Sequence, residues 1–472
     1  MLIKNIHRLS LLTQRSFYQA NFKPKRMRNL HIPLNDKKPE FTTIEKAMKI
    51  IKSGMSIYAQ GTGASPMPLY HGLTKRIDDG NLKDLKLRYI LCLGQLPWIN
   101  PKYFDKIHMT SDFLDIMSRM AVDQGKVDYV PIILSQVPQI HSQLEEPFDV
   151  CLVGCSLPDD NGYVSLSMSI DAALSAARNS KNIIAICSSK MPYTYGDGII
   201  HVSQLAALIH DEKYEPIKDT IVKFEKGSAE DKIGKIIADN LIDDGATIQC
   251  GIGGIPDAVC THLDKHKNLG IHTELLSGGF TRLIKSGVVN GLKKSMHIGK
   301  HVACFAIGDQ DLYDLMHKNP NIIMNCCSYT NNIEIIAKQS KMTAINSCIE
   351  IDLTGQIVAD SVGKRFYSGF GGQTDFMTGA GMAYDNEGKA IMALTSRTDK
   401  GETKIVPYIK QGSGVVTTRG HVKYVVTEYG VAQLSGKSVR QRAFELINIA
   451  HPDDREMLEK EAFERLKVMP SK

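Results

Sequence analysis

The stretch "GATIQCGIGGIP", from Gly245 to Pro256, places a short apolar run before a cluster of glycines and a proline. An earlier stretch, "GMSIYAQGTGASP" from Gly54 to Pro66, has the same order. Each reads as a glycine, a short strand, Gly-x-Gly, and a proline before a helix-like stretch. We interpret this echo as one α/β unit that occurs twice, although strand–glycine–helix patterns also recur by chance in α/β chains.

Further strand-like runs on both sides of these stretches extend the pattern. Helix-patterned segments separate the runs, and near-continuous apolar strands of this kind predict parallel sheets covered on both faces. A polar, charged span at 210–232 divides the runs into two sets, so we place the domain connection there. The predicted fold is therefore two tandem open α/β domains with mostly parallel sheets, at 36–225 and 226–472. The runs are "MSIYAQG", "LRYILCL", "YVPIIL", "DVCLVG", "NIIAICS", "ATIQCGIGG", "HVACFAIG", "NIIMNCC", "TAINSCIEI", "AIMALTS" and "HVKYVVTE".

Charge and hydropathy exclude two classes of partner. The net charge is +6, but seven basic residues and no acidic ones lie in residues 1–35. Removing those seven from 57 Lys and Arg leaves 50 against 51 Asp and Glu, so the body is near neutral. A basic groove for nucleic acid is therefore not expected. The sequence contains no run of about 18 uncharged apolar residues, so no membrane-spanning helix is predicted.

The first residues have the composition of a targeting sequence. "MLIKNIHRLSLLTQRSFYQANF" is amphipathic, free of acids and contains Arg and Ser. This composition predicts a mitochondrial transit peptide, which we place at 1–35, and a location in the mitochondrial matrix. The alternative is a basic tail that carries no targeting signal.

Cysteine spacing gives no sign of a metal centre. The ten cysteines are scattered, many of them in apolar runs, and none forms a CxxC pair or a zinc motif. We expect free thiols, no disulfide framework and no bound metal.

Two glycine motifs suggest nucleotide sites but each lacks a required residue. The loop after Cys250 is followed about twenty residues later by Glu274, the offset of the ribose-binding acid in a dinucleotide fold. The third glycine of G-x-G-x-x-G, however, falls at Pro256. Gly436-Lys437-Ser438 resembles the end of a phosphate-binding P-loop, but its first glycine is replaced by Val431. Ser438 is better explained as a helix N-cap.

A third glycine cluster suggests acyl chemistry. "RFYSGFGGQTDFMTGAG" holds Gly369, Gly371 and Gly372 in one loop, whose bare amides can stabilise an oxyanion. Asp375 can orient the groups around it. A plain turn is the alternative explanation.

Taken together, the chain resembles the acetyl-CoA hydrolase/CoA-transferase family, especially its 4-hydroxybutyrate and acetate–succinate branches. The resemblance covers nearly everything after residue 35 and implies the tandem α/β fold. It implies that Glu274 is the nucleophile, which becomes a glutamyl-CoA thioester. The segments that carry it are "PDDNGYVSLSMSIDAALSAA", "KMPYTYGDGIIHVS", "QCGIGGIPDAV", "LGIHTELLSGG", "SGFGGQTDF", "IVPYIKQGSGVVTTRGHVKYVVTEYGVAQLSGKS" and "LINIAHPDDRE".

The same resemblance implies the binding residues. CoA-binding residues match Gly251, Ile252, Gly253, Gly254 and Ile255, and the second glycine loop matches Gly371 and Gly372. Lys400 lies near a position where family members often carry a CoA-facing lysine; a solvated loop cation is the alternative. The family often reads Ser-Asp-Gly after the glutamate, where this chain has Ser277-Gly278-Gly279. The resemblance therefore does not identify the residues of the acyl pocket.

The expected activity is CoA transfer between small carboxylic acids, with acetyl-CoA and succinate giving acetate and succinyl-CoA. Acyl-CoA is then a substrate, with no permanently bound cofactor. Alternatives are acetyl-CoA hydrolysis through the same intermediate, 4-hydroxybutyrate or butyrate CoA transfer, and a non-catalytic acyl-CoA-binding protein. We expect no nucleic-acid or membrane partner, and a homodimer or larger homo-oligomer.

Overall fold

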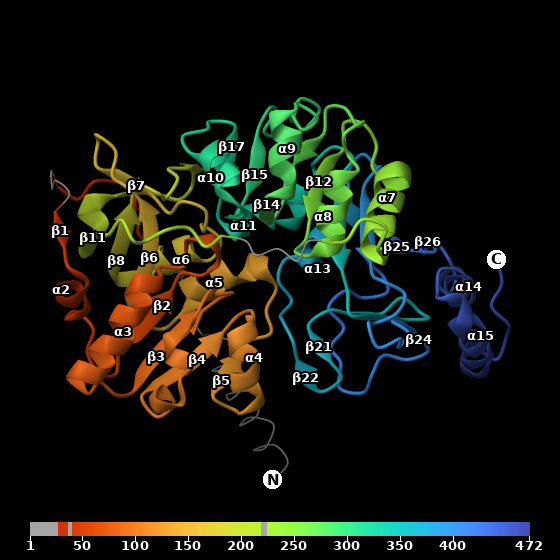
Figure 1. The fold of residues 1–472 in the computed structure, drawn as a ribbon, viewed down its shortest axis with the longest axis horizontal. Helices are drawn as coiled ribbons and strands as arrows, with labels where there is room; N and C mark the ends of the chain where they lie inside the picture. Colours follow the sequence, from red (N-terminus) through yellow and green to blue (C-terminus); the bar gives the residue numbers. More distant parts are fainter. Residues whose placement is uncertain (1–26, 36–39, 219–223) are drawn as a thin grey trace, which may run out of the picture.

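The computed structural model describes residues 27–35, 40–218 and 224–472. The N-terminal half and the C-terminal half lie side by side, and helices α14 and α15 project at the far end (Figure 1). The predicted α/β class with mostly parallel sheets is confirmed. Most of the predicted leader lies outside the described residues.

An eight-stranded parallel sheet forms the core of the N-terminal half. Strands β6 and β8 at its centre are buried along nearly their whole length, as parallel strands covered on both faces are. In spatial order the strands are β1 (Phe41–Thr42), β11 (Ala207–His210), β8 (Ser180–Ser188), β6 (Phe148–Ser156), β2 (Ser56–Ala59), β3 (Leu85–Tyr89), β4 (Ile107–Ser111) and β5 (Val127–Tyr129). The helices of this half are α2 (Ile44–Met48), α3 (Met67–Gly80), α4 (Ile116–Asp123), α5 (Val137–Gln143) and α6 (Ala173–Arg178).

A six-stranded sheet forms the core of the C-terminal half and is parallel except for its last strand. Its order is β13 (Gly270–Ile271), β12 (Thr247–Cys250), β18 (Thr343–Ser347), β23 (Lys389–Ala393), β25 (Tyr424–Thr427) and β26 (Gly430–Gln433). The helices are α7 (Ala229–Leu241), α8 (Gly254–Thr261), α9 (Gly279–Lys285), α10 (Gln310–Met316), α11 (Cys327–Thr330), α12 (Ile333–Ala337), α13 (Gln373–Gly381), α14 (Val439–Asn448) and α15 (Pro452–Leu466).

Small sheets connect the two halves and carry the site. Strand β9 of the N-terminal half pairs with β17 of the C-terminal half. The small sheets are β7 (Tyr163–Ser165) with β10 (Ile199–His201); β14 (Leu275–Ser277) with β16 (Phe305–Ile307); β15 (His301–Ala303), β17 (Ile322–Met324) and β9 (Tyr195–Gly196); β20 (Ile357–Val358), β19 (Glu350–Asp352) and β24 (Ile405–Val406); and β21 (Ser361–Val362) with β22 (Arg365–Phe366).

The two echoed stretches fold alike. Strand β2 leads through a glycine turn into α3, and β12 leads through a glycine loop into α8. Gly253, the N-cap of α8, has φ 132° and ψ 177°, a conformation open essentially to glycine alone. The duplication of one unit stays a prediction.

Three of the predicted strands differ from the structure. "TAINSCIEI" is divided between β18 and β19, which lie in separate sheets. "YVPIIL" contributes only its first residue to β5, because Pro131 has no N–H to donate to a ladder. "HVACFAIG" is divided at Cys304 into β15 and β16, which lie in separate sheets. At this break the Cys304 carbonyl accepts the N–H groups of Ile170 and Asp171 from the N-terminal half.

Residues at the end of the predicted leader pack on the N-terminal half. Leu30 is buried, and its carbonyl accepts the N–H of His201 at 3.0 Å. Arg28 donates to the Ser180 carbonyl at 2.9 Å and to Gln204 Oε1 at 2.7 Å. The leader boundary at residue 35 stays a prediction, and a cut there would remove these contacts.

The P-loop alternative is excluded by the local structure. Gly436-Lys437-Ser438 follows β26, the second strand of an antiparallel hairpin, and the Lys437 ammonium is paired with Glu445. Ser438 is the N-cap of α14, in a capping box with Gln441, as predicted.

Candidate active site

Glu274 lies between β13 and β14, with its backbone held by the break at Cys304. The N–H groups of Cys304 and Phe305 both donate to the Glu274 carbonyl, each at 3.1 Å. This pairing fixes the backbone and directs the partly exposed side chain into a cleft between the two glycine loops.

Two donors hold the Glu274 carboxylate. Asn331 Nδ2 donates to Glu274 Oε2 at 2.9 Å, and the Gly372 N–H also donates to the carboxylate. A Cβ on Gly372 would overlap both Glu274 Oε2 and Asn331 Nδ2, so only glycine fits at this position. The second glycine loop therefore brings bare backbone against the Glu274 carboxylate.

The environment makes Glu274 less acidic than an exposed glutamate. Burial raises its pKa from 4.5 to about 7, and the negative charge of Asp171 adds to this rise. The hydrogen bonds from Asn331 and Gly372 favour the ionised form and act in the opposite direction. Asp171 comes from the N-terminal half, is itself buried, and has a pKa raised to about 6 by burial. The ionised form of Glu274, which is the form able to attack a carbonyl, is therefore reached at a higher pH than in an exposed glutamate.

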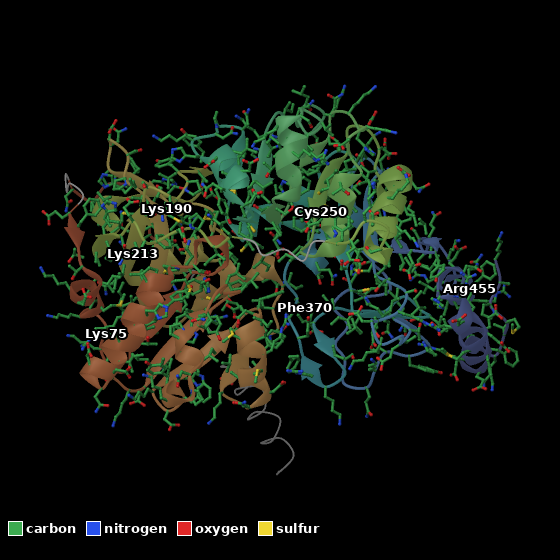
Figure 2. All side chains as sticks on the ribbon, in the orientation of Figure 1. Lys75, Lys190, Lys213, Cys250, Phe370 and Arg455 are labelled. Atoms are coloured by element: carbon green, nitrogen blue, oxygen red, sulfur yellow. The ribbon has the colours of Figure 1, made fainter. Side chains whose placement is uncertain are left out.

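The cleft around Glu274 has a volume of about 200 Å³. It holds both glycine loops, with Gly251 and Ile252 from one and Gly369, Gly371 and Gly372 from the other. Cys250 and Phe370, which also line it, lie near the centre of the molecule where the two halves meet (Figure 2). No Lys, Arg or His is among the described residues that line this cleft. Its polar side chains besides Glu274 are Gln249, Asn346, Ser347, Ser368 and Gln373.

A second hollow of about 470 Å³ continues the groove past the first glycine loop. The two hollows share Ile252 and Ser347, and Gly253, Gly254 and Ile255 line the second. All five predicted residues of this loop thus lie along one groove that begins at Glu274.

Lys400 is not brought to this groove. It lies in an exposed turn and is absent from the lining of both hollows. Lys404, four residues later, lines the second hollow, and its Nζ lies 3.3 Å from Thr395 Oγ1. Spacing along the sequence does not fix the path of this loop, so it could not show which of the two lysines faces the groove.

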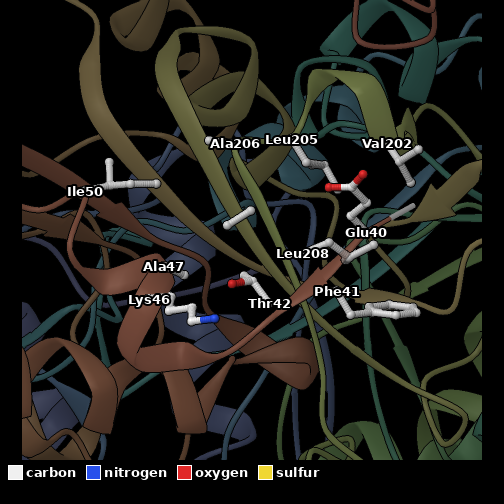
Figure 3. Close-up of a pocket in the computed structure, with 11 residues that line it drawn as sticks. Glu40, Phe41, Thr42, Lys46, Ala47, Ile50, Val202, Leu205, Ala206 and Leu208 are labelled. Atoms are coloured by element: carbon white, nitrogen blue, oxygen red, sulfur yellow. The ribbon is translucent and has the colours of Figure 1, made fainter. Parts of the chain in front are cut away.

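Another hollow, of about 280 Å³, lies beside edge strand β1 (Figure 3). Residues of β1, α2 and β11 and of the segments before β1 and β11 line it, including Glu40, Lys46 and Leu208. None of the predicted site residues lines it.

The sequence analysis missed Asn331 and Asp171. They lie 57 residues after and 103 residues before Glu274, and although Asp171 falls in the quoted segment "PDDNGYVSLSMSIDAALSAA", no local signal marks either residue as a partner of Glu274. Among the described residues, no group of three or more His, Cys, Asp and Glu is placed to hold a metal ion. The same part of the chain contains no helix long and apolar enough to cross a membrane.

Comparison with known proteins assigns the chain to a family. Residues 34–219 match the acetyl-CoA hydrolase/transferase N-terminal domain, and 308–462 match the C-terminal domain of the same family. The chain belongs to the acetyl-CoA hydrolase/transferase family, and its enzymatic class is that of the CoA-transferases.

Individual relatives match over most of their length. The chain is 43% identical to a succinyl-CoA:acetate/propanoyl-CoA:succinate CoA transferase of Fasciola hepatica, over 90% of this chain and 88% of the relative. It is 40% identical to a 4-hydroxybutyrate coenzyme A transferase of Clostridium kluyveri, over 89% and 96%. The crystal structure of RipA from Yersinia pestis superposes with a TM-score of 0.82 at 31% identity, over 90% of this chain and 97% of RipA.

Proposed function

We propose that the protein transfers CoA from acetyl-CoA to succinate, giving acetate and succinyl-CoA, with Glu274 as the covalent carrier. The observation that carries the proposal is the Glu274 carboxylate in a cleft between two glycine loops, with donors from Asn331 and Gly372. The similarity to a transferase of these acyl groups supports this choice of substrates.

The first half of the reaction loads CoA onto the enzyme. The ionised Glu274 attacks the thioester carbonyl of acetyl-CoA, and the tetrahedral oxyanion expels CoA thiolate to leave a glutamyl–acetyl anhydride. The thiolate then attacks the glutamyl carbonyl and expels acetate, which leaves a glutamyl-CoA thioester. In the second half, succinate attacks this thioester to form a new anhydride and releases the thiolate. The thiolate attacks the succinyl carbonyl, so that succinyl-CoA departs and the Glu274 carboxylate is regenerated.

The donors at Glu274 determine which oxyanion the enzyme stabilises. Both Asn331 Nδ2 and the Gly372 N–H are directed at the oxygens of the glutamate itself. When the thiolate attacks the glutamyl carbon, negative charge develops on one of these oxygens, and donors already in place stabilise it without reorganisation.

An acceptor panel tests the proposal. Acetyl-CoA consumption is followed with succinate, acetate, propionate, butyrate, 4-hydroxybutyrate or no acceptor, using wild type and Glu274→Ala. We expect turnover that depends on succinate and is lost in Glu274→Ala. Equal consumption without any acceptor would identify a hydrolase instead, in which water resolves the intermediate. Tight CoA binding without any turnover would identify a non-catalytic acyl-CoA-binding protein.

A second candidate substrate is 4-hydroxybutyrate, favoured by the neutral lining of the cleft. A dicarboxylate is bound most strongly by a cation, whereas the polar side chains here are amides and hydroxyls, such as Gln249, Asn346 and Ser368. These groups suit a terminal hydroxyl as well as a carboxylate. A higher kcat/KM for 4-hydroxybutyrate than for succinate in the same panel would select this candidate.

The matrix location is also a proposal, and it rests on the composition of residues 1–22, which lie outside the described residues. Residues 1–35 fused to a fluorescent protein are expected to direct it to mitochondria. Diffuse fluorescence throughout the cell would reject the targeting role.

A further inference from the structure

A short segment of the N-terminal half reaches the hydrogen-bond network of the nucleophile. Ile133 forms an isolated parallel bridge with Gly371, and the Leu134 N–H donates to the Gly371 carbonyl at 2.9 Å. Ser135 donates twice to Asp375, from Oγ to Oδ1 at 2.7 Å and from N to Oδ2 at 3.2 Å. One segment of the N-terminal half thus holds both the second glycine loop and a buried carboxylate of the C-terminal half.

Asp375 continues this contact toward the nucleophile. It lies in the first turn of α13 with 1% of its surface exposed. Asn331 Nδ2 lies 3.4 Å from Asp375 Oδ2 and 2.9 Å from Glu274 Oε2. Because an amide nitrogen carries two hydrogens, Asn331 can donate to both carboxylates at once. The contacts form one chain, from Ser135 through Asp375 and Asn331 to Glu274.

The chain of contacts fixes which way the Asn331 amide faces. With the amide reversed, its oxygen would face two carboxylates, and both would lose a donor in a buried environment. At the other end of the amide, Asn331 Oδ1 faces the Cys304 thiol at 3.8 Å, and this thiol also lies 3.4 Å from the Glu274 carbonyl. Asp375 therefore selects the orientation that directs an N–H at Glu274.

We propose that Ser135 and Asp375 are positioning residues for CoA transfer. They orient the Asn331 amide, and Leu134 holds the loop that supplies the Gly372 N–H, so the donor set at the nucleophile is complete only when both halves are docked. This inference rests on the proposed role of Glu274 as nucleophile. Neither Ser135 nor Asp375 lines the groove, so both act through Asn331 and Gly372.

The charges around Glu274 give the proposal a measurable signature. The ionisable groups that act on this region are Asp375, Asp171 and the Cys304 thiol. Burial and the charge of Glu274 raise the pKa of Asp375 to about 7, against the hydrogen bonds from Ser135. Coupling between two charges is mutual, so a neutral residue at position 375 lowers the pKa of Glu274. Removing the Ser135 hydroxyl raises the pKa of Asp375 further and acts in the same direction.

The test compares four variants in the CoA-transfer assay across pH: Ser135→Ala, Ser135→Thr, Asp375→Asn and the matched control Ser142→Ala. Ser142 lies on nearby α5 and donates only to the Gln139 carbonyl. For Ser135→Ala we expect kcat to fall about tenfold, the effect of losing one hydrogen bond to a charged group. The KM for acyl-CoA stays within about twofold, because the groove is untouched. The acid limb of the pH profile moves to lower pH in Ser135→Ala and Asp375→Asn, and Ser135→Thr and Ser142→Ala behave like wild type.

Two outcomes overturn the proposal. One is a wild-type kcat and an unmoved acid limb in Ser135→Ala. The other is a loss of kcat in Ser135→Ala that Ser135→Thr does not restore, with the limb unmoved, which would indicate a merely structural role. If Asp375→Asn does not fold, Ser135→Ala and Ser135→Thr decide the question. Glu274→Ala measured in parallel separates the two claims: residual turnover there rejects the proposed function, whereas a dead Glu274→Ala beside a normal Ser135→Ala rejects only the positioning role.

Discussion

Replacing Glu274 with Gln is expected to stabilise the protein while abolishing CoA transfer. The glutamine keeps an acceptor for Asn331 and Gly372 but removes a carboxylate that must lose its hydration on folding. The pKa of Glu274 is raised from 4.5 to about 7 in the folded protein. Since one pKa unit corresponds to about 1.4 kcal/mol, the difference amounts to about 3 kcal/mol in the free energy of unfolding once the pH exceeds 7.

The sign and the pH window follow from the same shift. Between pH 4.5 and 7 the folded protein binds the Glu274 proton more tightly than the unfolded chain, so wild type loses stability as the pH rises through this range. The glutamine side chain of the variant does not titrate, so the advantage of the variant should be small near pH 4.5 and reach its full size above pH 7. For a chain of this length about 3 kcal/mol corresponds to roughly 3 °C in melting temperature.

The assay is thermal melting of wild type and Glu274→Gln at pH 5, 6, 7 and 8. Glu459→Gln, on the exposed surface of α15, is the matched control and should melt like wild type throughout. A difference that grows with pH supports the account. A constant difference, or a variant that melts below wild type at pH 8, would refute the claim that burial raises the pKa of Glu274.

Three further predictions concern activity. Gly372→Ala should lose at least about a hundredfold in kcat, as when an oxyanion donor is removed, because the new Cβ overlaps Glu274 and Asn331. The control is Gly381→Ala, at the other end of the helix that Gly372 caps. Its Cβ meets only ordinary contacts, so it should retain wild-type activity in the CoA-transfer assay. Lys404→Ala should raise the KM for acyl-CoA several-fold and Lys400→Ala should not, since only Lys404 lines the groove; equal effects in steady-state kinetics would contradict this placement. The kcat/KM of wild type should fall tenfold per pH unit well below a pKa of about 7, because a protonated Glu274 cannot attack, and a profile flat down to pH 5 would be inconsistent with this.

The strands and glycine loops were predictable because their signals are local. Apolar runs between glycines predicted β12 and the loop from Gly251 to Ile255, and the structure has both. The N-cap at Ser438 could be predicted for the same reason. "YVPIIL" was wrong as a strand because one proline outweighs the hydrophobic pattern around it.

The partners of Glu274 were not predictable because they depend on long-range contacts. Ser135 and Asp375 are 240 positions apart, and Asn331 is 57 positions from Glu274. Ser135 and Asn331 are ordinary polar residues in their own stretches. Asp375 could be singled out beside the glycine loop as a group that orients its neighbours, but the sequence does not say which groups it orients. That Lys404 lines the groove and Lys400 does not was also not predictable, because the path of the loop decides which lysine faces the groove.

Mass spectrometry of the CoA-loaded enzyme tests the covalent role of Glu274 most directly. Protein mixed with acetyl-CoA is treated with borohydride, which reduces a glutamyl thioester to the alcohol, and the peptide that contains Glu274 is sequenced. The account predicts reduction at Glu274 only, absent in Glu274→Gln and absent without acetyl-CoA. An unmodified Glu274 in protein that is turning over, or modification of another residue, would contradict it.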